Sequence, residues 1–305
     1  MKNNINNITK ILLLLFIIMP NNKILASNEY CGKSYSALVY DATNGDILFE
    51  KNSEKISYPA SLVKLMTLYL TFEALDKKEL KLDDVLIVSR RGEEISRVNN
   101  GNSLHLKAGD KITVEEAIRG IVVKSFNEAA VTLSEAVSGD EWEFVRKMNK
   151  AASHLGMINT SFRNASGLHE DGQYTTAFDL ARLAYAIKTK FPNYYPVFAS
   201  KGFTYKKRTY VTHNHVLLEY DGAEGMKTGF TRASGFNLIA AAKRKNQQIF
   251  SIIMGCDSQN KRDQFTKALL DYGFKKIFSD SWQKNQNTNL KNQQKFNEIL
   301  DNQQY

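Results

Sequence analysis

The stretch PASLVKLMTLYLTFEAL, residues 59–75, is apolar on nearly every side when it is drawn as a helix. A helix that is apolar all round belongs inside a large domain, because each of its faces needs a packing partner. Pro59, Ala60 and Ser61 are residues that commonly open a helix. The stretch therefore predicts a buried central helix, around which the remaining elements pack.

Strand patterns lie on both sides of this helix in the sequence. Residues 36–40 and 47–50 flank a turn that contains Asn44-Gly45, which predicts an antiparallel hairpin. Strands at both ends of the chain and helices between them predict an α+β domain whose sheet joins the two ends. The late strands are expected at residues 225–231, 236–243 and 249–255, and an amphipathic helix is expected at 263–277.

Capping patterns predict three helices in the middle of the chain. In each pattern a Thr or Asp is followed three positions later by an acidic residue, which satisfies free backbone N–H groups at a helix start. The pairs are Thr113 with Glu116, Asp140 with Glu143, and Thr176 with Asp179. The helices that they open are expected at residues 117–123, 140–156 and 177–190.

The composition is that of an ordinary soluble globular protein, with 43% apolar and 24% charged residues. Lys and Arg outnumber Asp and Glu by 41 to 32, which gives a net charge of +9. Residues 1–26 hold three of these lysines and no acidic residue, so the rest of the chain carries about +6. The basic residues are spread along the chain instead of forming stripes, so we expect no nucleic-acid partner.

The two ends of the chain are expected to lie outside the folded domain. Lys2 and Lys10 precede an apolar run at 11–19 and a polar break that leads to Ala26, which is the layout of a secretory signal peptide over residues 1–26. That run is about half of the length that crosses a bilayer, so we expect an exported protein without a stable membrane anchor. Residues 279–305 contain 12 Asn and Gln and little apolar periodicity, which predicts a disordered tail.

The histidines and cysteines are few. His213 and His215 alternate as metal ligands can, but no third or fourth ligand accompanies them, so we expect no metal. Cys31 and Cys256 lie 225 positions apart, which excludes a CxxC motif. In an oxidising compartment such a pair either forms a disulfide or stays buried as two free thiols.

Ser61 and Lys64 carry the first pattern with chemical meaning, Ser-x-x-Lys. Side chains three positions apart share one face of a helix, and a buried lysine loses its charge readily enough to take a proton from serine. The start of a helix also favours negative charge that develops near the serine. The pattern alone is weak, because further copies begin at Ser258 and Ser281.

Two further motifs strengthen it. Ser125-Phe126-Asn127 lies between two expected helices, and Lys227-Thr228-Gly229 lies in the first of the late strands. Ser-x-x-Lys, Ser-x-Asn and Lys-Thr-Gly, in this order, are the set that class A β-lactamases and penicillin-binding proteins use. The other hydrolase signatures GxSxG and HExxH do not occur, and neither other Ser-x-x-Lys copy precedes a Lys-Thr-Gly.

Longer stretches resemble the low-molecular-weight D-alanyl-D-alanine carboxypeptidases, a family of penicillin-binding proteins. The resemblance covers about residues 32–278 and implies a single catalytic domain of the serine β-lactamase and transpeptidase type, with a five-stranded antiparallel sheet flanked by helices. It implies an enzyme that removes the terminal D-alanine of the peptidoglycan stem pentapeptide in the periplasm, that β-lactams inhibit and that needs no cofactor. The stretches are PASLVKLMT at 59–67, NASGL at 164–168, YTTA at 174–177 and GMKTGFT at 225–231.

The resemblance also implies the catalytic residues. Ser61 attacks the carbonyl between the two terminal D-alanines and forms an acyl-enzyme. Lys64 takes the serine proton as general base, and Ser125 relays a proton to the leaving amine.

The same resemblance implies the substrate-binding residues. Asn127 would hydrogen-bond the substrate amide through both its donor and its acceptor. Lys227 and Thr228 would bind the terminal carboxylate, and Gly229 would let a substrate strand lie close to the backbone. The N–H groups of Ser61 and Phe230 would form an oxyanion hole, which typically contributes about 3 kcal/mol.

The sequence departs from the family pattern at Phe126, where glycine is common, so we expect this ring to narrow the site. The sequence shows no pattern for the C-terminal β-domain or the amphipathic anchor frequent in the family.

Two alternative functions share the three motifs. A class A β-lactamase needs a Glu-x-x-Leu-Asn, which does not occur here, and Glu170 is the only similar acid nearby. A non-catalytic penicillin sensor usually has membrane helices and a partner domain.

In the fold that the resemblance implies, the first strand lies antiparallel beside the last. Cys31 stands just before the first strand and Cys256 just after the last. Their side chains could then approach the roughly 5.5 Å Cα separation of a disulfide. Two unpaired buried thiols are the alternative.

Overall fold

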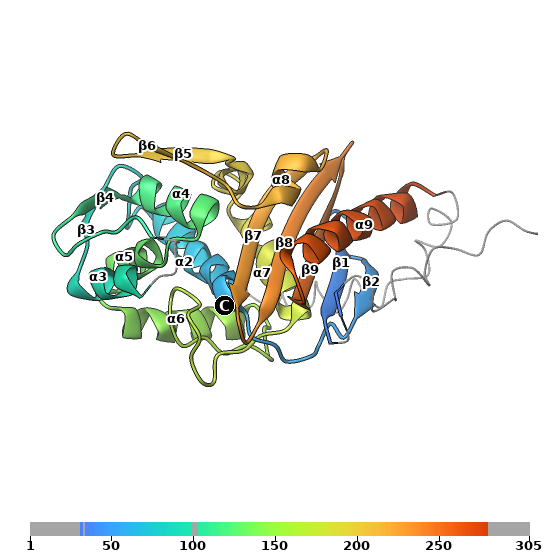
Figure 1. Cartoon of the computed structure of the whole chain (residues 1–305), viewed down its shortest axis with the longest axis horizontal. Coiled ribbons are helices and arrows are strands. Elements are labelled where there is room, and N and C mark those ends of the chain that lie inside the picture. The colour runs from blue at the N-terminus through green and yellow to red at the C-terminus, as the bar shows by residue number, and fades with distance from the viewer. Residues whose placement is uncertain (1–30, 33, 99–102, 280–305) are drawn as a thin grey trace, which may run out of the picture.

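The computed structural model describes residues 31–32, 34–98 and 103–279. A five-stranded sheet has the strand order β2-β1-β9-β8-β7, and every neighbouring pair is antiparallel. The first strand pairs with the last, so the sheet joins the two ends of the domain as predicted (Figure 1). The strands are β1 (Ser36–Asp41), β2 (Ile47–Lys51), β7 (Ala223–Thr231), β8 (Gly235–Arg244) and β9 (Gln247–Cys256).

Helices cover both faces of this sheet. The helix α9 (Gln259–Phe278) lies across the front of the sheet in Figure 1, and α7 (Ala177–Lys190) lies behind it. Because both faces are covered, residues 248–254 of β9 are all buried, and the strand shows no alternation of apolar and polar residues.

The predicted central helix is α2 (Lys64–Asp76), in which 11 of 13 residues are buried. It contacts α5, α6 and α7, and one hydrophobic cluster runs from these helices to the sheet. A second cluster packs α9 on the same sheet, so the described chain is a single domain around this sheet. The elements around α2 are η1 (Ala60–Val63), α3 (Arg90–Arg97), α4 (Val114–Lys124), α5 (Asn127–Ser138) and α6 (Glu141–His154).

All three predicted caps are present. Thr113 and Glu116 form the capping box of α4. Asp140 and Thr176 accept hydrogen bonds from backbone N–H groups three residues later, at the starts of α6 and α7. Local hydrogen bonds of this kind depend on residues close in sequence, which is why the pattern identified them.

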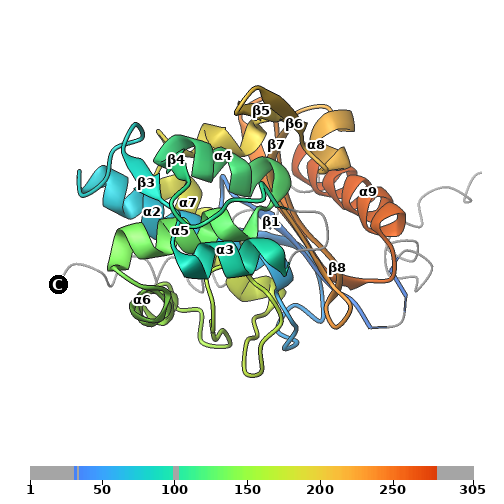
Figure 2. The ribbon, with the colours of Figure 1, turned by 60° about the vertical axis from the view of Figure 1, so that its left-hand side comes forward.

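The start of the central helix differs from the prediction. Residues 60–63 form a 3₁₀ turn, η1, and the α-helix begins only at Lys64. Several short elements were not predicted, because three to five residues are too few to show a periodicity. Figure 2 shows the hairpin of β5 and β6 over α4. These elements are β3 (Val85–Ile87), β4 (Lys111–Thr113), η2 (Tyr195–Ala199), β5 (Gly202–Tyr205), β6 (Arg208–Val211) and α8 (His215–Glu219).

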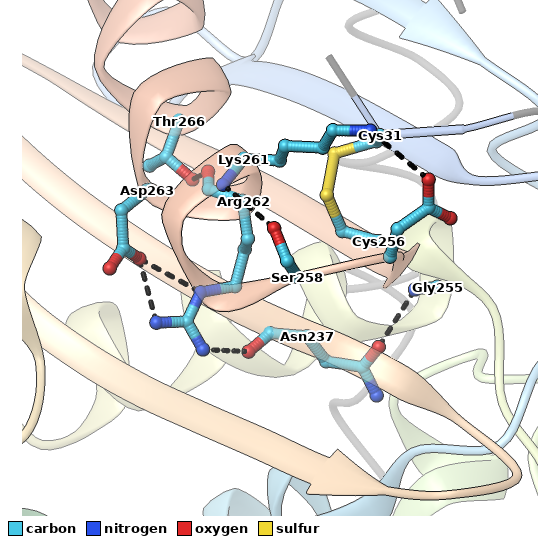
Figure 3. The surroundings of a disulfide bond; sticks show 10 residues. Cys31, Asn237, Gly255, Cys256, Ser258, Lys261, Arg262, Asp263 and Thr266 are labelled. Atoms are coloured by element: carbon cyan, nitrogen blue, oxygen red, sulfur yellow. Dashed lines mark hydrogen bonds and ion pairs between the residues drawn. A yellow bond between two sulfur atoms is a disulfide. The ribbon is translucent and has the colours of Figure 1, made fainter. Parts of the chain in front are cut away.

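Cys31 and Cys256 form a disulfide with a Cα–Cα distance of 4.4 Å, so the predicted bridge is confirmed and the alternative of two free thiols is wrong (Figure 3). The bond joins the residues before β1 to the end of β9. It lies at the end of the sheet where β1 starts and β9 finishes, which the antiparallel pairing of Ser36 with Met254 brings together.

The predicted signal peptide at 1–26 lies outside the described residues, and so does the predicted tail at 279–305 apart from Ser279. Among the helices of the described chain, none combines the length and the apolar character that a membrane crossing requires.

Candidate active site

The nucleophile candidate Ser61 lies in η1, with backbone packed against it from two directions. A Cβ atom added to Gly229 of β7 would lie 3.2 Å from the Ser61 backbone nitrogen. A Cβ atom added to Gly167, which has a φ of +80°, would lie 2.0 Å from the Ala60 carbonyl oxygen. Position 167 therefore requires glycine, and Gly229 leaves little room for a larger residue. Together they hold the turn of Ser61 between β7 and the loop that contains Gly167.

Lys64 lies one helical turn after Ser61 and is fully buried. Its Nζ is 3.1 Å from the Ser61 hydroxyl oxygen and 2.6 Å from Oδ1 of Asn127, and it also donates to the backbone carbonyl of Ser166. The two carbonyl oxygens can only accept hydrogen bonds. A neutral amine has two N–H groups and one lone pair, so donating both N–H groups to these oxygens leaves the lone pair directed at Ser61.

The environment of Lys64 favours that neutral amine. Burial lowers the pKa of Lys64 well below its ordinary value, and the positive charge of Lys227 lowers it further, while Glu128 acts in the opposite direction. Desolvation penalises the charged form of a lysine, which makes the uncharged base more available than in an exposed lysine. The geometry and the pKa shift both favour Lys64 as the group that takes the Ser61 proton.

Ser125 and Asn127 come from the junction of α4 and α5. Ser125 ends α4 with a left-handed φ of 63°, and its buried hydroxyl has no hydrogen-bond partner within the described chain. Asn127 is the first residue of α5, and its Oδ1 accepts a hydrogen bond from Lys64. An amide oxygen has two lone pairs, so the contact with Lys64 leaves room for a second hydrogen bond, and the contact of both amide groups of Asn127 with the substrate stays a prediction.

Phe126 does not narrow the site as expected. Its ring is 2% exposed and packs edge-on against Tyr210 and Phe203, with ring centroids 5.4 Å and 6.2 Å away. It does not border the cleft beside Ser61. The side chain turns away from the cleft because the β5–β6 hairpin offers it an aromatic packing site.

On β7, Lys227, Thr228 and Gly229 are buried, whereas the Phe230 side chain is exposed. Lys227 is 1% exposed, and its Nζ donates to the Thr228 carbonyl oxygen at 2.8 Å. Burial, with help from the positive charge of Arg262, lowers the pKa of Lys227 to about 7. Lys227 is therefore charged below about pH 7 and becomes neutral above it.

His213 contacts the same strand. Its Nε2 lies 2.7 Å from the Thr228 hydroxyl oxygen. Burial lowers the pKa of His213 to about 3, and the charges of Lys227 and Lys124 add to the effect. A neutral imidazole therefore fixes the Thr228 hydroxyl, and neither His213 nor His215 joins a cluster of metal-ligating side chains in the part of the chain that the structure describes.

Some of these groups border a cleft of about 320 Å³. It brings together five residues that the sequence predicted: Ser61, Ser125, Thr228, Gly229 and Phe230. Three predicted residues, Lys64, Asn127 and Lys227, do not border it and lie buried behind its wall. The cleft has five further residues for which the sequence analysis gave no role: Lys124, His213, Phe236, Gln259 and Arg262.

Arg262 is the clearest omission among them. It is 3% exposed, and its guanidinium donates to Oδ1 of Asp263 at 2.7 Å and 2.8 Å and to the Asn237 carbonyl at 3.4 Å (Figure 3). It belongs to no motif, so nothing in the sequence distinguishes it from the other basic residues of α9, which are lysines. Only the packing of α9 on the sheet brings it to the cleft that Ser61 borders.

Asn237 links the parts of the site. Its fully buried amide donates to the carbonyls of Tyr58 and Pro59 at 3.1 Å and 3.2 Å, and accepts from the Gly255 N–H at 2.8 Å. It thus ties the segment before Ser61 to β8 and β9, while its own carbonyl meets Arg262. We assign Asn237 a positioning role, because it does not border the cleft.

A serine with a buried lysine of lowered pKa beside it, in a cleft between an antiparallel sheet and a helical region, is the arrangement of serine-nucleophile acyl-transfer enzymes of the penicillin-binding type. The comparisons agree with this class. The profile of the D-alanyl-D-alanine carboxypeptidase family, peptidase family S11, matches residues 24–258. The chain therefore belongs to that family.

Individual relatives are similar over most of this chain. D-alanyl-D-alanine carboxypeptidase DacF of Bacillus subtilis is 36% identical over 253 residues, which are 81% of this chain and 64% of DacF. The chain thus spans less than two thirds of that relative. Penicillin-binding protein 6B of Escherichia coli is 34% identical with a TM-score of 0.74, covering 80% of this chain and 77% of that one. Penicillin-binding protein D2 of Listeria monocytogenes, solved with cefotaxime bound, is 31% identical with a TM-score of 0.70, covering 78% and 96%.

Proposed function

We propose that this protein is a serine D-alanyl-D-alanine carboxypeptidase that removes the terminal D-alanine from peptidoglycan stem pentapeptides. The observation that carries the proposal is the contact of the fully buried Lys64 amine with the Ser61 hydroxyl, at 3.1 Å, next to a cleft bordered by cations. The family membership supports the same activity.

In the acylation step, Ser61 attacks the carbonyl of the penultimate D-alanine. Lys64 accepts the serine proton through its lone pair, since its two N–H groups are held by Asn127 and Ser166. A nucleophile and base within hydrogen-bond distance need no large movement before reaction. The bond to the terminal D-alanine breaks, and its amine leaves with a proton relayed through the Ser125 hydroxyl.

The cations beside the cleft explain a preference for the end of a peptide. Arg262 and Lys124 border it, and Lys227 lies behind the Thr228 side of its wall. A free carboxylate at this position gains charge-assisted hydrogen bonds that an internal peptide bond cannot make. The cleft thus selects the C-terminal residue of its substrate.

The edge strand β7 would hold the reacting carbonyl. The Phe230 N–H and the Ser61 N–H form the oxyanion hole in this proposal, which the close approach of Gly229 to Ser61 permits. Two such donors stabilise the tetrahedral intermediate by several kcal/mol, about 3 kcal/mol for one donor. Water then attacks the acyl-enzyme, and Lys64 serves again as the base.

A β-lactam carries an amide and a carboxylate that imitate the substrate terminus, so we propose that such antibiotics acylate Ser61 and block the enzyme. Cefotaxime occupies penicillin-binding protein D2 of Listeria monocytogenes, a relative with the same fold. We also propose that the protein is exported and works on the periplasmic, wall-facing side of the inner membrane. The disulfide supports export, because such bonds persist in oxidising compartments.

The test uses the purified protein, a synthetic stem pentapeptide and penicillin. Mass spectrometry should show release of one D-alanine per peptide and a penicillin adduct on the tryptic peptide that contains Ser61. Ser61→Ala and Lys64→Ala should both abolish the adduct. Ser258→Ala is the matched control, because Ser258 belongs to another Ser-x-x-Lys copy but serves only as the N-cap of α9.

A penicillin adduct with no release of D-alanine would overturn the carboxypeptidase activity in favour of a penicillin-binding sensor. Turnover of penicillin faster than about one per second would instead indicate a β-lactamase.

A further inference from the structure

A second hollow lies directly beside the active-site cleft. Its volume is about 660 Å³, and it shares Phe230 and Phe236 with the cleft. The centroids of these two rings are 4.3 Å apart, and the rings form the border between the two spaces. The other wall residues come from the segment before η1, the β7–β8 turn and the end of β9, and include Lys55, Tyr58, Arg232 and Asp257.

The direction of β7 decides which part of a substrate would reach this hollow. In the proposed function the terminal carboxylate lies at Lys227 and Thr228, whereas the hollow begins at Phe230 and continues through Arg232 to Phe236. With the scissile carbonyl at the Phe230 N–H, the peptide before that bond must leave past Phe230. Because β7 is an edge strand, its outer N–H and C=O groups are available to guide that segment.

The hollow carries uncompensated positive charge. Lys55 donates to the Ser34 carbonyl at 3.0 Å and to the Ser34 hydroxyl at 2.6 Å, both of which are neutral. The Arg232 side chain makes no ion pair and no hydrogen bond within the described chain. The acid of the hollow, Asp257, is already paired with Lys261 at 3.4 Å. Two cations therefore remain for an anionic ligand.

Exposed apolar groups complete the surface. Ile56, Tyr58 and Phe230 are 51%, 44% and 52% exposed, which is unusual for side chains of this size. Aliphatic and aromatic surface of this kind packs on the stem of a long side chain while the cations meet its charged end. A carboxylate on a flexible alkyl stem matches both properties.

We propose that this hollow, which we call the upstream subsite, binds a carboxylate-bearing residue of the substrate peptide that precedes the scissile bond. Lys55 and Arg232 pair with the carboxylate, and the rings of Tyr58 and Phe230 contact the stem. This inference rests on the proposed function, because it takes the position of the scissile bond from it. It makes the enzyme selective for acidic stem peptides as well as for a free C-terminus.

The test compares two peptides that end in D-Ala-D-Ala and differ only in one upstream residue, Glu or Gln. The wild-type protein should favour the Glu peptide by about threefold to tenfold in kcat/KM at low salt, the range expected for two partly exposed ion pairs. Arg232→Gln and Lys55→Gln should each reduce this ratio, and the double variant should bring it close to one. Lys150→Gln, which removes an exposed cation from α6, is the matched control and should leave it unchanged.

Two further measurements separate the subsite from the proposed function. Acylation by benzylpenicillin, which has no upstream residue, should proceed equally in the wild type and in the double variant. Peptide affinities measured by calorimetry on Ser61→Ala should show the same Glu preference without any turnover. If the double variant keeps the wild-type ratio in both assays, the subsite is wrong. Failure to release D-alanine, with the Glu preference intact in calorimetry, would overturn the proposed function alone.

Discussion

Replacing both Cys31 and Cys256 by alanine should destabilise the domain strongly. The disulfide closes a loop with a sequence separation of 225 residues. In the chain-entropy model, a loop of about this length restricts the unfolded state by about 5 kcal/mol at 25 °C. Alanine suits both positions because the cysteines are fully buried, where a serine hydroxyl would need a hydrogen-bond partner.

For a domain of this size, a loss of about 5 kcal/mol corresponds to a melting temperature lower by about 10–20 °C. Urea unfolding followed by circular dichroism, analysed for both the midpoint and the slope, gives the free energy of unfolding directly. The wild type measured with a thiol reductant is the control and should approach the double variant. Acylation of Ser61 should persist below the melting temperature, because neither cysteine borders the active-site cleft.

A loss below about 1 kcal/mol would refute this reasoning, because it would mean that the unfolded chain is not restricted by the loop. A changed unfolding slope together with an unchanged midpoint would likewise show that the lost stability does not come from loop closure in the unfolded chain.

Three other perturbations test the geometry of the site. Gly167→Ala should lower the acylation rate by displacing the turn of Ser61, because the added Cβ would meet the Ala60 carbonyl oxygen at 2.0 Å. Gly109→Ala is the control, since Gly109 also has a positive φ but open space around it. Stopped-flow acylation at the wild-type rate in both variants would contradict the close packing. Asn237→Ala removes three hydrogen bonds to backbone groups, of which the Pro59 carbonyl keeps a second donor in the Leu62 N–H. It should therefore lower the free energy of unfolding by about 2–3 kcal/mol in urea titrations and slow acylation of the folded protein. Unchanged acylation would remove its positioning role. The profile of kcat/KM against pH should be bell-shaped. The rate should fall on the acid side as Lys64, whose pKa is lowered, becomes protonated, and it should fall above about pH 7 as Lys227 loses its charge. A plateau that continues to pH 9 would show that Lys227 does not attract the carboxylate.

The sequence by itself determined the parts of this protein that depend on neighbouring residues. The caps at Thr113, Asp140 and Thr176 were predictable because their hydrogen bonds span three residues. The buried character of α2 was predictable from its composition alone, and the order of the three motifs identified Ser61 and Lys64 as partners. The disulfide followed once the strand order was known.

The tertiary structure decided what surrounds those residues. Ser166 holds the Lys64 amine across 102 positions of sequence, and Arg262 reaches the cleft only because α9 packs on the sheet. The orientation of Phe126 was unpredictable for the same reason, since its aromatic partners lie more than 70 positions away on β5 and β6. Local hydrogen bonds and periodicity are encoded within a few residues, whereas the lowered pKa of Lys64 and the charge of the cleft arise from segments that meet only in the folded chain.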